Sequence, residues 1–342
     1  MVGVRQQALQ EFHEIPAWFY ETPVKELARV AGGPMLIHLK GARSPALFVS
    51  ALLHGNEWTG LLALREWLKG LTPRNRPLPR DLILFVGNVE AAAINERRLA
   101  DGPDFNRIWR EPPPAVAPLV HRILDLMRGN PPFAAIDIHN NTGKNPAYAC
   151  VSQWEHRHLH LALLFGRLVV FSEQPTTTFA YTSSEFCPAV TLECGLSGEP
   201  AGVARAVEYL DACAHLSAFP THPVLPQDIE GYRTMARISV LDGVSFAFGE
   251  AACPNPDSIV FRSDLDSLNF RELPVGTAIG FASTLDGITV HDKDGAPVDC
   301  LSLREGQIVT TRPLVPAMLS VSPIAVRYDC LGYVMERLEV PR

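Results

Sequence analysis

Between residues 34 and 218, short apolar segments alternate with longer segments in which apolar positions recur with helical periodicity. Apolar runs of about four to eight residues are typical of buried strands. Strands that are apolar throughout and separated by helices favour a sheet covered on both faces. We therefore predict an α/β fold with a mostly parallel central sheet, helices on both faces and a zinc carboxypeptidase-like architecture. The predicted strands are MLIHLK, ALFVSALL, LILFVGN, FAAIDIH, AYACVS and AVTLEC, and the predicted helices are WTGLLALREWLKG, VAPLVHRILDLMRG, WEHRHLHLALLFGRL and AGVARAVEYLDACAHLS.

The pattern changes after residues 218–227, a segment punctuated by proline. Beyond it, short alternating segments are separated by Gly, Asp and Pro, which is typical of a compact β domain with tight turns. The length of 342 residues also exceeds the size of about 250 to 300 residues at which single cores stop growing. We predict a catalytic α/β domain over residues 1–218 and a smaller β domain over residues 222–342 that covers and narrows the cleft.

Three of the predicted strands end in residues that can bind a metal. ALFVSALLHGNE ends in His54 and Glu57, FAAIDIH ends in His139, and AVTLEC ends in Glu193. Ligand sites of open α/β sheets lie at the carboxyl ends of the strands. Two imidazoles and one carboxylate are the usual ligands of a catalytic zinc that keeps a further position open for water. Asp137 shares a strand face with His139 and could accept the outer N–H of its imidazole.

Each of these signals is weak alone, because a short His-x-x-Glu motif at a strand end is more often an ordinary loop. His158 and His160 also suggest metal binding, but two residues apart on a helix they face different sides. We assign these two histidines no chemistry. The combination of the strand ends carries the prediction.

Five motifs in order, HGNE, NVEAAAINER, DFNRIW, DIHNNT and LECG, resemble the zinc-dependent succinylglutamate desuccinylase and aspartoacylase family, a branch of the metallocarboxypeptidase superfamily. The resemblance covers most of residues 46–206. A weaker similarity continues into the segment NFRELPVGTAIG. The resemblance of the five motifs implies one Zn²⁺ per chain, held by His54, Glu57 and His139.

The resemblance also implies roles for residues beyond the metal ligands. Glu193 matches the general base, which takes a proton from the attacking water and passes it to the leaving amine. Arg97 matches the arginine that holds the developing oxyanion, although the adjacent Arg98 remains an alternative. Asn106 and Arg107 match the pair that binds the substrate carboxylate, for which the planar guanidinium is well suited.

The segment after His139 offers further contacts, of which Asn140 is the one we predict to bind substrate, although its composition also suits an ordinary turn. Two departures from the family concern the shape of the pocket. Residues 97–106 form a stretch about two residues longer than the corresponding stretch of the family's motif pattern in the best-known deacylases. Val89 stands where proline is often found.

Composition narrows the range of partners. With 37 acidic and 30 basic side chains and no basic cluster, nothing indicates binding to nucleic acid or to an anionic membrane. No apolar stretch approaches the roughly 18 residues of a membrane span, and the N-terminal segment lacks a secretory pattern, which predicts a cytoplasmic protein. Seven cysteines without a C-x-x-C pair predict free thiols. The expected partner is a small molecule, and the sequence leaves open whether the chain forms a homo-oligomer.

We therefore expect a zinc-dependent hydrolase that cleaves the amide bond of a small carboxylate-bearing substrate, most simply an N-acyl amino acid. A metallocarboxypeptidase with the same ligands and the same Asn106 and Arg107 clamp is the first alternative. A catalytically silent relative that serves as a binding or regulatory protein is the second. The identity of the acyl group and the amino acid depends on loops whose conformation the pattern does not determine.

Overall fold

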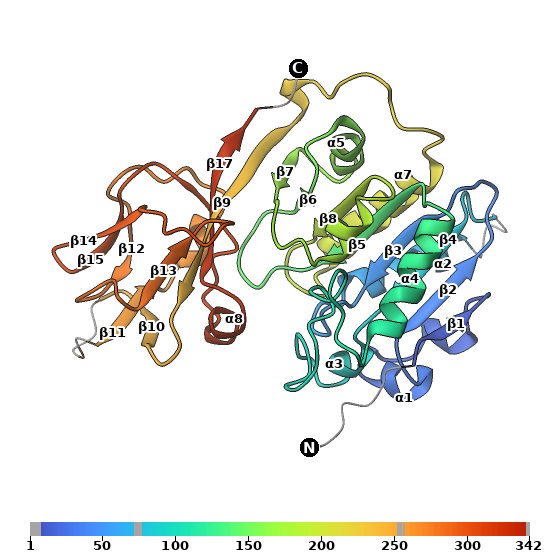
Figure 1. Cartoon of the computed structure of the whole chain (residues 1–342), viewed down its shortest axis with the longest axis horizontal. Coiled ribbons are helices and arrows are strands. Elements are labelled where there is room, and N and C mark those ends of the chain that lie inside the picture. The colour runs from blue at the N-terminus through green and yellow to red at the C-terminus, as the bar shows by residue number, and fades with distance from the viewer. Residues whose placement is uncertain (1–7, 72–76, 252–254, 256, 340–342) are drawn as a thin grey trace. The chain divides into compact units, whose positions relative to one another are not determined.

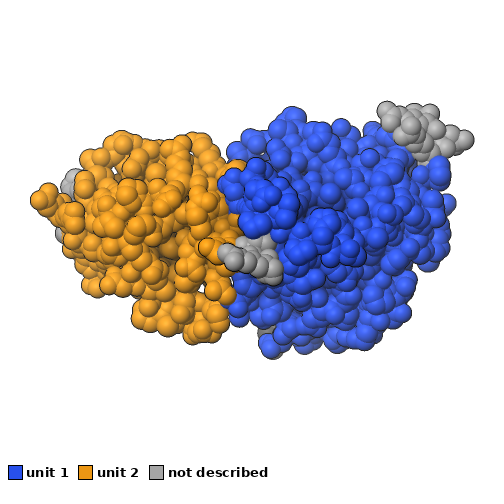
Figure 2. All heavy atoms as spheres, turned by 90° about the horizontal axis from the view of Figure 1, so that it is seen from above, with its two compact units in different colours: residues 1–140, 147–230, 340–342 blue, residues 141–146, 231–339 orange. Residues whose placement is uncertain are grey.

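The computed structural model describes residues 8–71, 77–251, 255 and 257–339. The chain divides into two compact units, coloured separately in Figure 2. The first unit comprises residues 1–140, 147–230 and 340–342, and the second comprises residues 141–146 and 231–339. The short segment 141–146 thus belongs with the second unit, although the first unit surrounds it in the sequence.

The first unit is built on a mixed sheet. Its strands lie in the order β1-β2-β4-β3-β5-β8-β6-β7. Neighbours run parallel except for two antiparallel pairs, β2 with β4 and β6 with β8. All six strands predicted from the sequence are present, whereas the short strands β1 and β7 were not predicted. The bounds are β1 Gln10–Phe12, β2 Met35–Leu39, β3 Leu47–Ala51, β4 Leu82–Val86, β5 Ala134–His139, β6 Tyr148–Val151, β7 Leu168–Phe171 and β8 Ala189–Glu193.

Helices cover both faces of this sheet because its strands alternate between two apolar clusters. Leu47 and Val49 of β3 pack in one cluster with α2, α5 and α7, while Phe48 packs in the other with α4 and α6. Figure 1 shows α4 lying across the strands. The helices are α1 Leu27–Ala31, α2 Thr59–Leu71, α3 Val89–Ala93, α4 Ala117–Gly129, α5 His156–Leu163, α6 Phe179–Ser183 and α7 Pro200–His215, with 3₁₀ turns at Ala17–Tyr20, Val24–Glu26 and Pro226–Asp228.

The second unit is rich in β structure, as the sequence predicts for this region. Strand β9 pairs antiparallel with β17 and β13, and β17 pairs with β16. A separate sheet has the order β10-β11-β12-β15-β14. The bounds are β9 Glu230–Val240, β10 Ser245–Gly249, β11 Ser258–Arg262, β12 Ala278–Phe281, β13 Ile288–His291, β14 Leu301–Arg304, β15 Gln307–Thr310, β16 Val315–Ala317, α8 Pro323–Tyr328 and β17 Gly332–Leu338, with a 3₁₀ turn at Leu265–Leu268.

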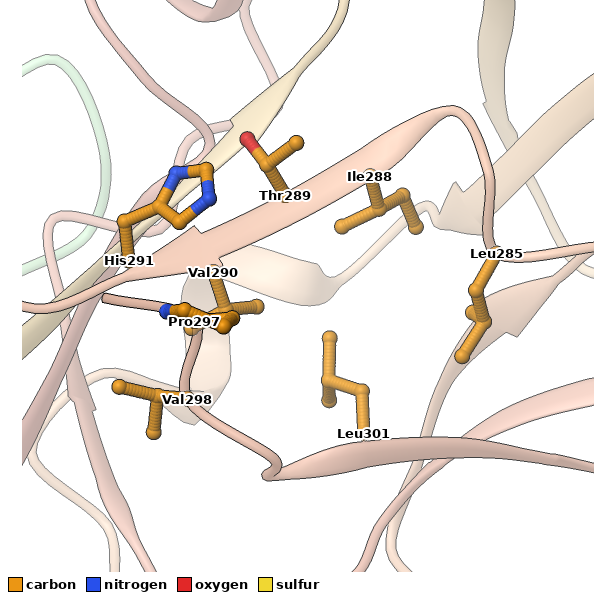
Figure 3. A pocket seen from close by; sticks show the side chains of 8 residues that line it. All are labelled: Leu285, Ile288, Thr289, Val290, His291, Pro297, Val298 and Leu301. Carbon is orange, nitrogen blue, oxygen red and sulfur yellow. The ribbon is translucent and has the colours of Figure 1, made fainter. Parts of the chain in front are cut away.

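A hollow of about 290 Å³ lies beside β13 in the second unit. Its lining is mostly aliphatic, with Ile288, Val290 and Leu301 among the side chains around it (Figure 3). The lining contains no acidic, lysine or arginine side chain, and we assign this hollow no catalytic chemistry.

The segment 141–146 is bound to the second unit by hydrogen bonds. Asn269 donates from Nδ2 to the carbonyl of Lys144 (3.3 Å), and the backbone N–H of Met318 donates to Oδ1 of Asn145 (2.9 Å). Gly143 approaches so closely that a Cβ there would lie 2.2 Å from the carbonyl oxygen of Leu319. Any larger residue would push the segment away from this backbone.

Two expectations from composition can be compared with the structure. Within the described residues, no helix combines the length and apolar sequence needed to cross a membrane. The cysteines that the structure describes are free thiols, as predicted, while Cys253 lies outside the described residues.

Candidate metal centre and catalytic site

A tight turn at the end of β3 brings His54 and Glu57 together. The backbone N–H of Glu57 donates to the carbonyl of His54 (3.2 Å), and α2 begins two residues later. Gly55 lies between them, where a Cβ would be 2.2 Å from the backbone nitrogen of Ala92 in α3. Only glycine allows this approach, so Gly55 holds the turn against α3 and fixes where both side chains begin.

His54, Glu57 and His139 converge on one point. Glu57 lies between the imidazoles, with Oε1 2.7 Å from Nδ1 of His54 and Oε2 2.8 Å from Nδ1 of His139. All three side chains are buried, and their candidate ligand atoms lie within 4.8 Å of one another. Two nitrogens and one carboxylate oxygen fit the chemistry of a catalytic zinc. The structure thus brings together the three ligands predicted from the sequence.

The outer nitrogen of each imidazole faces a carboxylate. Nε2 of His139 lies 2.9 Å from Oδ2 of Asp137, the predicted partner, and Nε2 of His54 lies 3.2 Å from Oδ1 of Asp104. An imidazole that donates its Nε2–H to a carboxylate keeps the lone pair of Nδ1 for a metal. In that tautomer, both histidines could bind a metal ion through Nδ1.

Asp104 is the residue that the sequence analysis missed. Its carboxylate also accepts hydrogen bonds from the backbone N–H of Asn106 (2.8 Å) and from Nε of Arg97 (3.1 Å). Burial alone raises the pKa of Asp104, but the hydrogen bond to His54 and the charges of Arg97 and Arg107 hold it well below the usual range. The sequence feature that could have identified Asp104 is its position at the start of the DFNR motif.

The same contacts shift the pKa values of Glu57 and His139. Burial opposes the charged form of Glu57, but His54 and His139 outweigh it and hold the pKa of Glu57 well below its usual value. Burial likewise lowers the pKa of His139, but Asp137 and Glu57 outweigh it and raise this pKa well above the usual value. The carboxylates thus provide the negative charge that a divalent cation requires.

Glu193 ends β8 directly opposite His139 of β5 in the strand register. Its Oε2 atom is buried and has no hydrogen-bond partner among the described residues. Burial, reinforced by the charges of Glu57 and Asp137, raises the pKa of Glu193 to about 8. A buried carboxylate oxygen without a partner, next to the three converging ligands, is suited to bind a water or a cation there.

The two adjacent arginines point to different partners. Arg97 makes an ion pair with Asp104 (3.1 Å), which places its guanidinium beside the His54 side of the site. Arg98 instead donates from Nη1 to the carbonyls of Leu99, Ala100 and Gly102. Arg98 therefore stabilises the loop after α3, whereas Arg97 contacts the residues around the ligands.

Asn106 lies within the site. Its Oδ1 accepts from the backbone N–H of Phe179 (3.0 Å), and its Nδ2 lies 3.2 Å from Nε2 of His139. Arg107 donates from Nη1 to the carbonyl of Asn106 (2.8 Å). This arrangement fixes both residues beside the metal ligands, with Asn106 buried and Arg107 partly exposed.

Asn140 uses its side chain within the fold. Nδ2 donates to Oγ1 of Thr59 (2.8 Å) and to the carbonyl of Gly195 (2.9 Å), while its backbone N–H donates to Oε2 of Glu57 (2.9 Å). Both amide hydrogens are therefore engaged. Asn140 thereby joins α2, β5 and the segment after β8, and its contact with substrate stays a prediction.

The raised pKa of Glu193 predicts a pH dependence of stability in the metal-free protein. The unfolded chain loses this proton near pH 4.5, whereas the folded chain keeps it up to about pH 8. Wild type therefore loses stability through this group as the pH rises across that window, and Glu193→Gln does not. Between pH 5 and pH 8, the free energy of unfolding of Glu193→Gln minus that of wild type should rise by about 1 to 3 kcal/mol. Urea unfolding in the presence of a chelator measures this difference, and a constant difference would contradict the assignment.

The chain is similar to a known protein family and to several solved structures. Residues 43–217 match the family model of the succinylglutamate desuccinylase/aspartoacylase catalytic domain. No curated protein matches the chain. Similar solved structures include a succinylglutamate desuccinylase from Chromobacterium violaceum, with 16% identity, a TM-score of 0.58 and coverage of 87% of this chain and 86% of that one.

Two further structures share the fold. A succinylglutamate desuccinylase/aspartoacylase from Rhodobacter sphaeroides has 17% identity and a TM-score of 0.56, with 88% of each chain covered. Murine aminoacylase 3 has 18% identity and a TM-score of 0.51, with 88% of this chain and 99% of that chain covered. The resemblance found from the five sequence motifs is thereby confirmed, and the chain belongs to the succinylglutamate desuccinylase/aspartoacylase family.

Proposed function

We propose that this protein is a zinc-dependent hydrolase that cleaves the amide bond of an N-acyl amino acid, with one Zn²⁺ per chain. The observation that carries the proposal is the convergence of His54, Glu57 and His139 beside Glu193, whose buried Oε2 has no hydrogen-bond partner among the described residues. Membership of the family supports the choice of an acyl amino acid as substrate.

The ligands would be Nδ1 of both histidines and the carboxylate of Glu57. Zinc, when bound there, would supply a Lewis acid that makes a water acidic near neutral pH, and its charge would favour the ionised form of Glu193. Asp104 and Asp137 keep the two imidazoles in the tautomer and orientation that metal binding requires.

The remaining steps fall to the side chains. The carboxylate of Glu193 accepts a proton from water as the water oxygen forms a bond to the acyl carbon. Glu193 then passes this proton to the nitrogen as the C–N bond breaks, which leaves a carboxylic acid, ionised at neutral pH by loss of its own proton to water, and a free amine. Arg97 would stabilise the negative charge on the former carbonyl oxygen, and its ion pair with Asp104 supports this role.

Asn106 and Arg107 are the proposed contacts for the substrate carboxylate. The guanidinium of Arg107 can form two parallel hydrogen bonds to a carboxylate, which fixes its orientation as well as its position. Because Asn106 is itself held by the backbone of Phe179, the pair is positioned before substrate arrives.

A matched pair of substrates tests the proposal. Zinc-loaded protein should hydrolyse an N-acetyl amino acid with a higher kcat/KM than the glycyl dipeptide with the same C-terminal residue. The two differ by the free amine, which an N-acyl site has no reason to accommodate. Faster turnover of the dipeptide would identify a carboxypeptidase. Zinc binding without turnover across a broad panel of both classes would identify a catalytically silent relative.

A further inference from the structure

Two neighbouring polar residues are buried in the sheet, on strands that lead to the proposed metal ligands. Ser50 of β3 and Asp137 of β5 are direct neighbours in the strand register, and both are fully buried, with 0% exposure. The residues two positions earlier on the same strands, Phe48 and Ala135, belong to the apolar cluster under α4 and α6. A buried hydroxyl and carboxylate are costly in such surroundings unless they are hydrogen-bonded.

The hydrogen bonds of these residues form a chain that leads to the ligands. Oγ of Ser50 donates to Oδ1 of Asp137, whose Oδ2 lies 2.9 Å from Nε2 of His139. Nδ1 of the same imidazole lies 2.8 Å from Glu57. Among the described residues, the hydrogen bonds of the Asp137 carboxylate go to Ser50 and His139.

We propose that Ser50 is a positioning residue of the metal centre. Its hydroxyl fixes the plane of the Asp137 carboxylate, so that Oδ2 meets Nε2–H of His139 and Nδ1 is held toward the metal. This inference rests on the proposed function, because it requires that the three ligands bind zinc.

The Ser50 hydroxyl matters because Asp137 has fewer hydrogen-bond donors among the described residues than Asp104, the carboxylate beside the other imidazole. Asp104, the partner of His54, is held by the backbone N–H of Asn106 and by Arg97 as well. Asp137 has Ser50 in place of these two donors. Loss of the Ser50 hydroxyl would leave Oδ1 buried without a partner and the carboxylate free to rotate about its terminal torsion.

Zinc affinity of Ser50→Ala, measured by competition with a chromogenic chelator, tests the proposal. Loss of an outer partner of a metal ligand typically costs about 10- to 100-fold in affinity, and we expect a loss of about 10-fold for Ser50→Ala. The matched control is Ser183→Ala in α6. Ser183 is also 0% exposed, and its hydroxyl contacts Sδ of Met127 at 3.9 Å. This control should bind zinc as wild type does.

A double-mutant cycle separates positioning from general destabilisation. If Ser50 acts through Asp137, Ser50→Ala should lower zinc affinity in wild type but not in the Asp137→Asn background. A merely structural role would lower affinity equally in both backgrounds and overturn the proposal. Should Ser50→Ala fail to fold, Ser50→Thr and Ser50→Val provide an isosteric pair. Threonine should then retain zinc affinity and valine should lose it.

The outcomes distinguish this inference from the proposed function. Wild-type protein that binds zinc and hydrolyses acyl amino acids, together with unchanged affinity in Ser50→Ala, would overturn the role of Ser50 alone. Wild-type protein that does not bind zinc at these ligands would overturn both.

Discussion

Replacing Glu57 with glutamine is expected to reduce the zinc content of the purified protein from about one ion per chain to almost none. Glu57 is the one carboxylate among the three proposed ligands, and it lies between Nδ1 of His54 and Nδ1 of His139. Glutamine keeps the shape but removes the charge that attracts the cation. The loss of affinity should exceed the about 10- to 100-fold that is typical of outer partners of a metal ligand.

Elemental analysis after metal-sparing purification measures this effect. The matched control is Glu66→Gln, the same substitution at an exposed position of α2, and this variant should keep its zinc. Retention of a full equivalent by Glu57→Gln would show that the metal binds elsewhere or is held without this carboxylate.

Replacing Glu193 with glutamine is expected to lower kcat by about 10²- to 10⁴-fold, the usual contribution of a general acid or base. The zinc content should remain that of wild type, because Glu193 is not one of the three converging ligands. KM should change little, since binding of the substrate carboxylate is assigned to Asn106 and Arg107. Loss of kcat without loss of metal is therefore the signature that separates Glu193 from Glu57.

Steady-state kinetics on an N-acetyl amino acid provides the measurement. Glu208→Gln, at an exposed position of α7, is the control and should keep wild-type kinetics. A Glu193→Gln variant with near-normal kcat would exclude this residue as the base and redirect the search to other groups around the ligands.

The parts of the site that the sequence predicts lie at strand ends. His54, His139 and Glu193 lie at the ends of apolar runs that are typical of buried strands, and parallel strands bring their carboxyl ends to one edge of a sheet. For that reason, residues far apart in the chain could be placed together before the structure was known. Strand β1 has only three residues and shows no pattern, whereas β7 begins at Leu168, the last residue of the predicted helix WEHRHLHLALLFGRL.

The role of Asp104 and the contacts of Asn140 within the fold have a different physical basis. Asp104 lies in an irregular loop, and its role depends on an approach to His54, 50 residues away, that no periodicity encodes. Asn140 is polar and adjacent to a ligand, which suggested a substrate contact. Its amide nevertheless binds Thr59 and Gly195, partners that only the three-dimensional arrangement reveals.

The division of the chain into two units has a consequence for domain grafting. The chain leaves the first unit one residue after Asn140, contributes residues 141–146 to the second unit, and returns at Ala147. A single crossover at residue 230 would join the second unit of a relative to the segment 141–146 of this chain. The two parts would then have to fit at Gly143, where the backbone of Leu319 leaves no space for a Cβ. We therefore expect that a functional chimaera of this chain needs three crossovers, with the short segment exchanged together with the C-terminal unit.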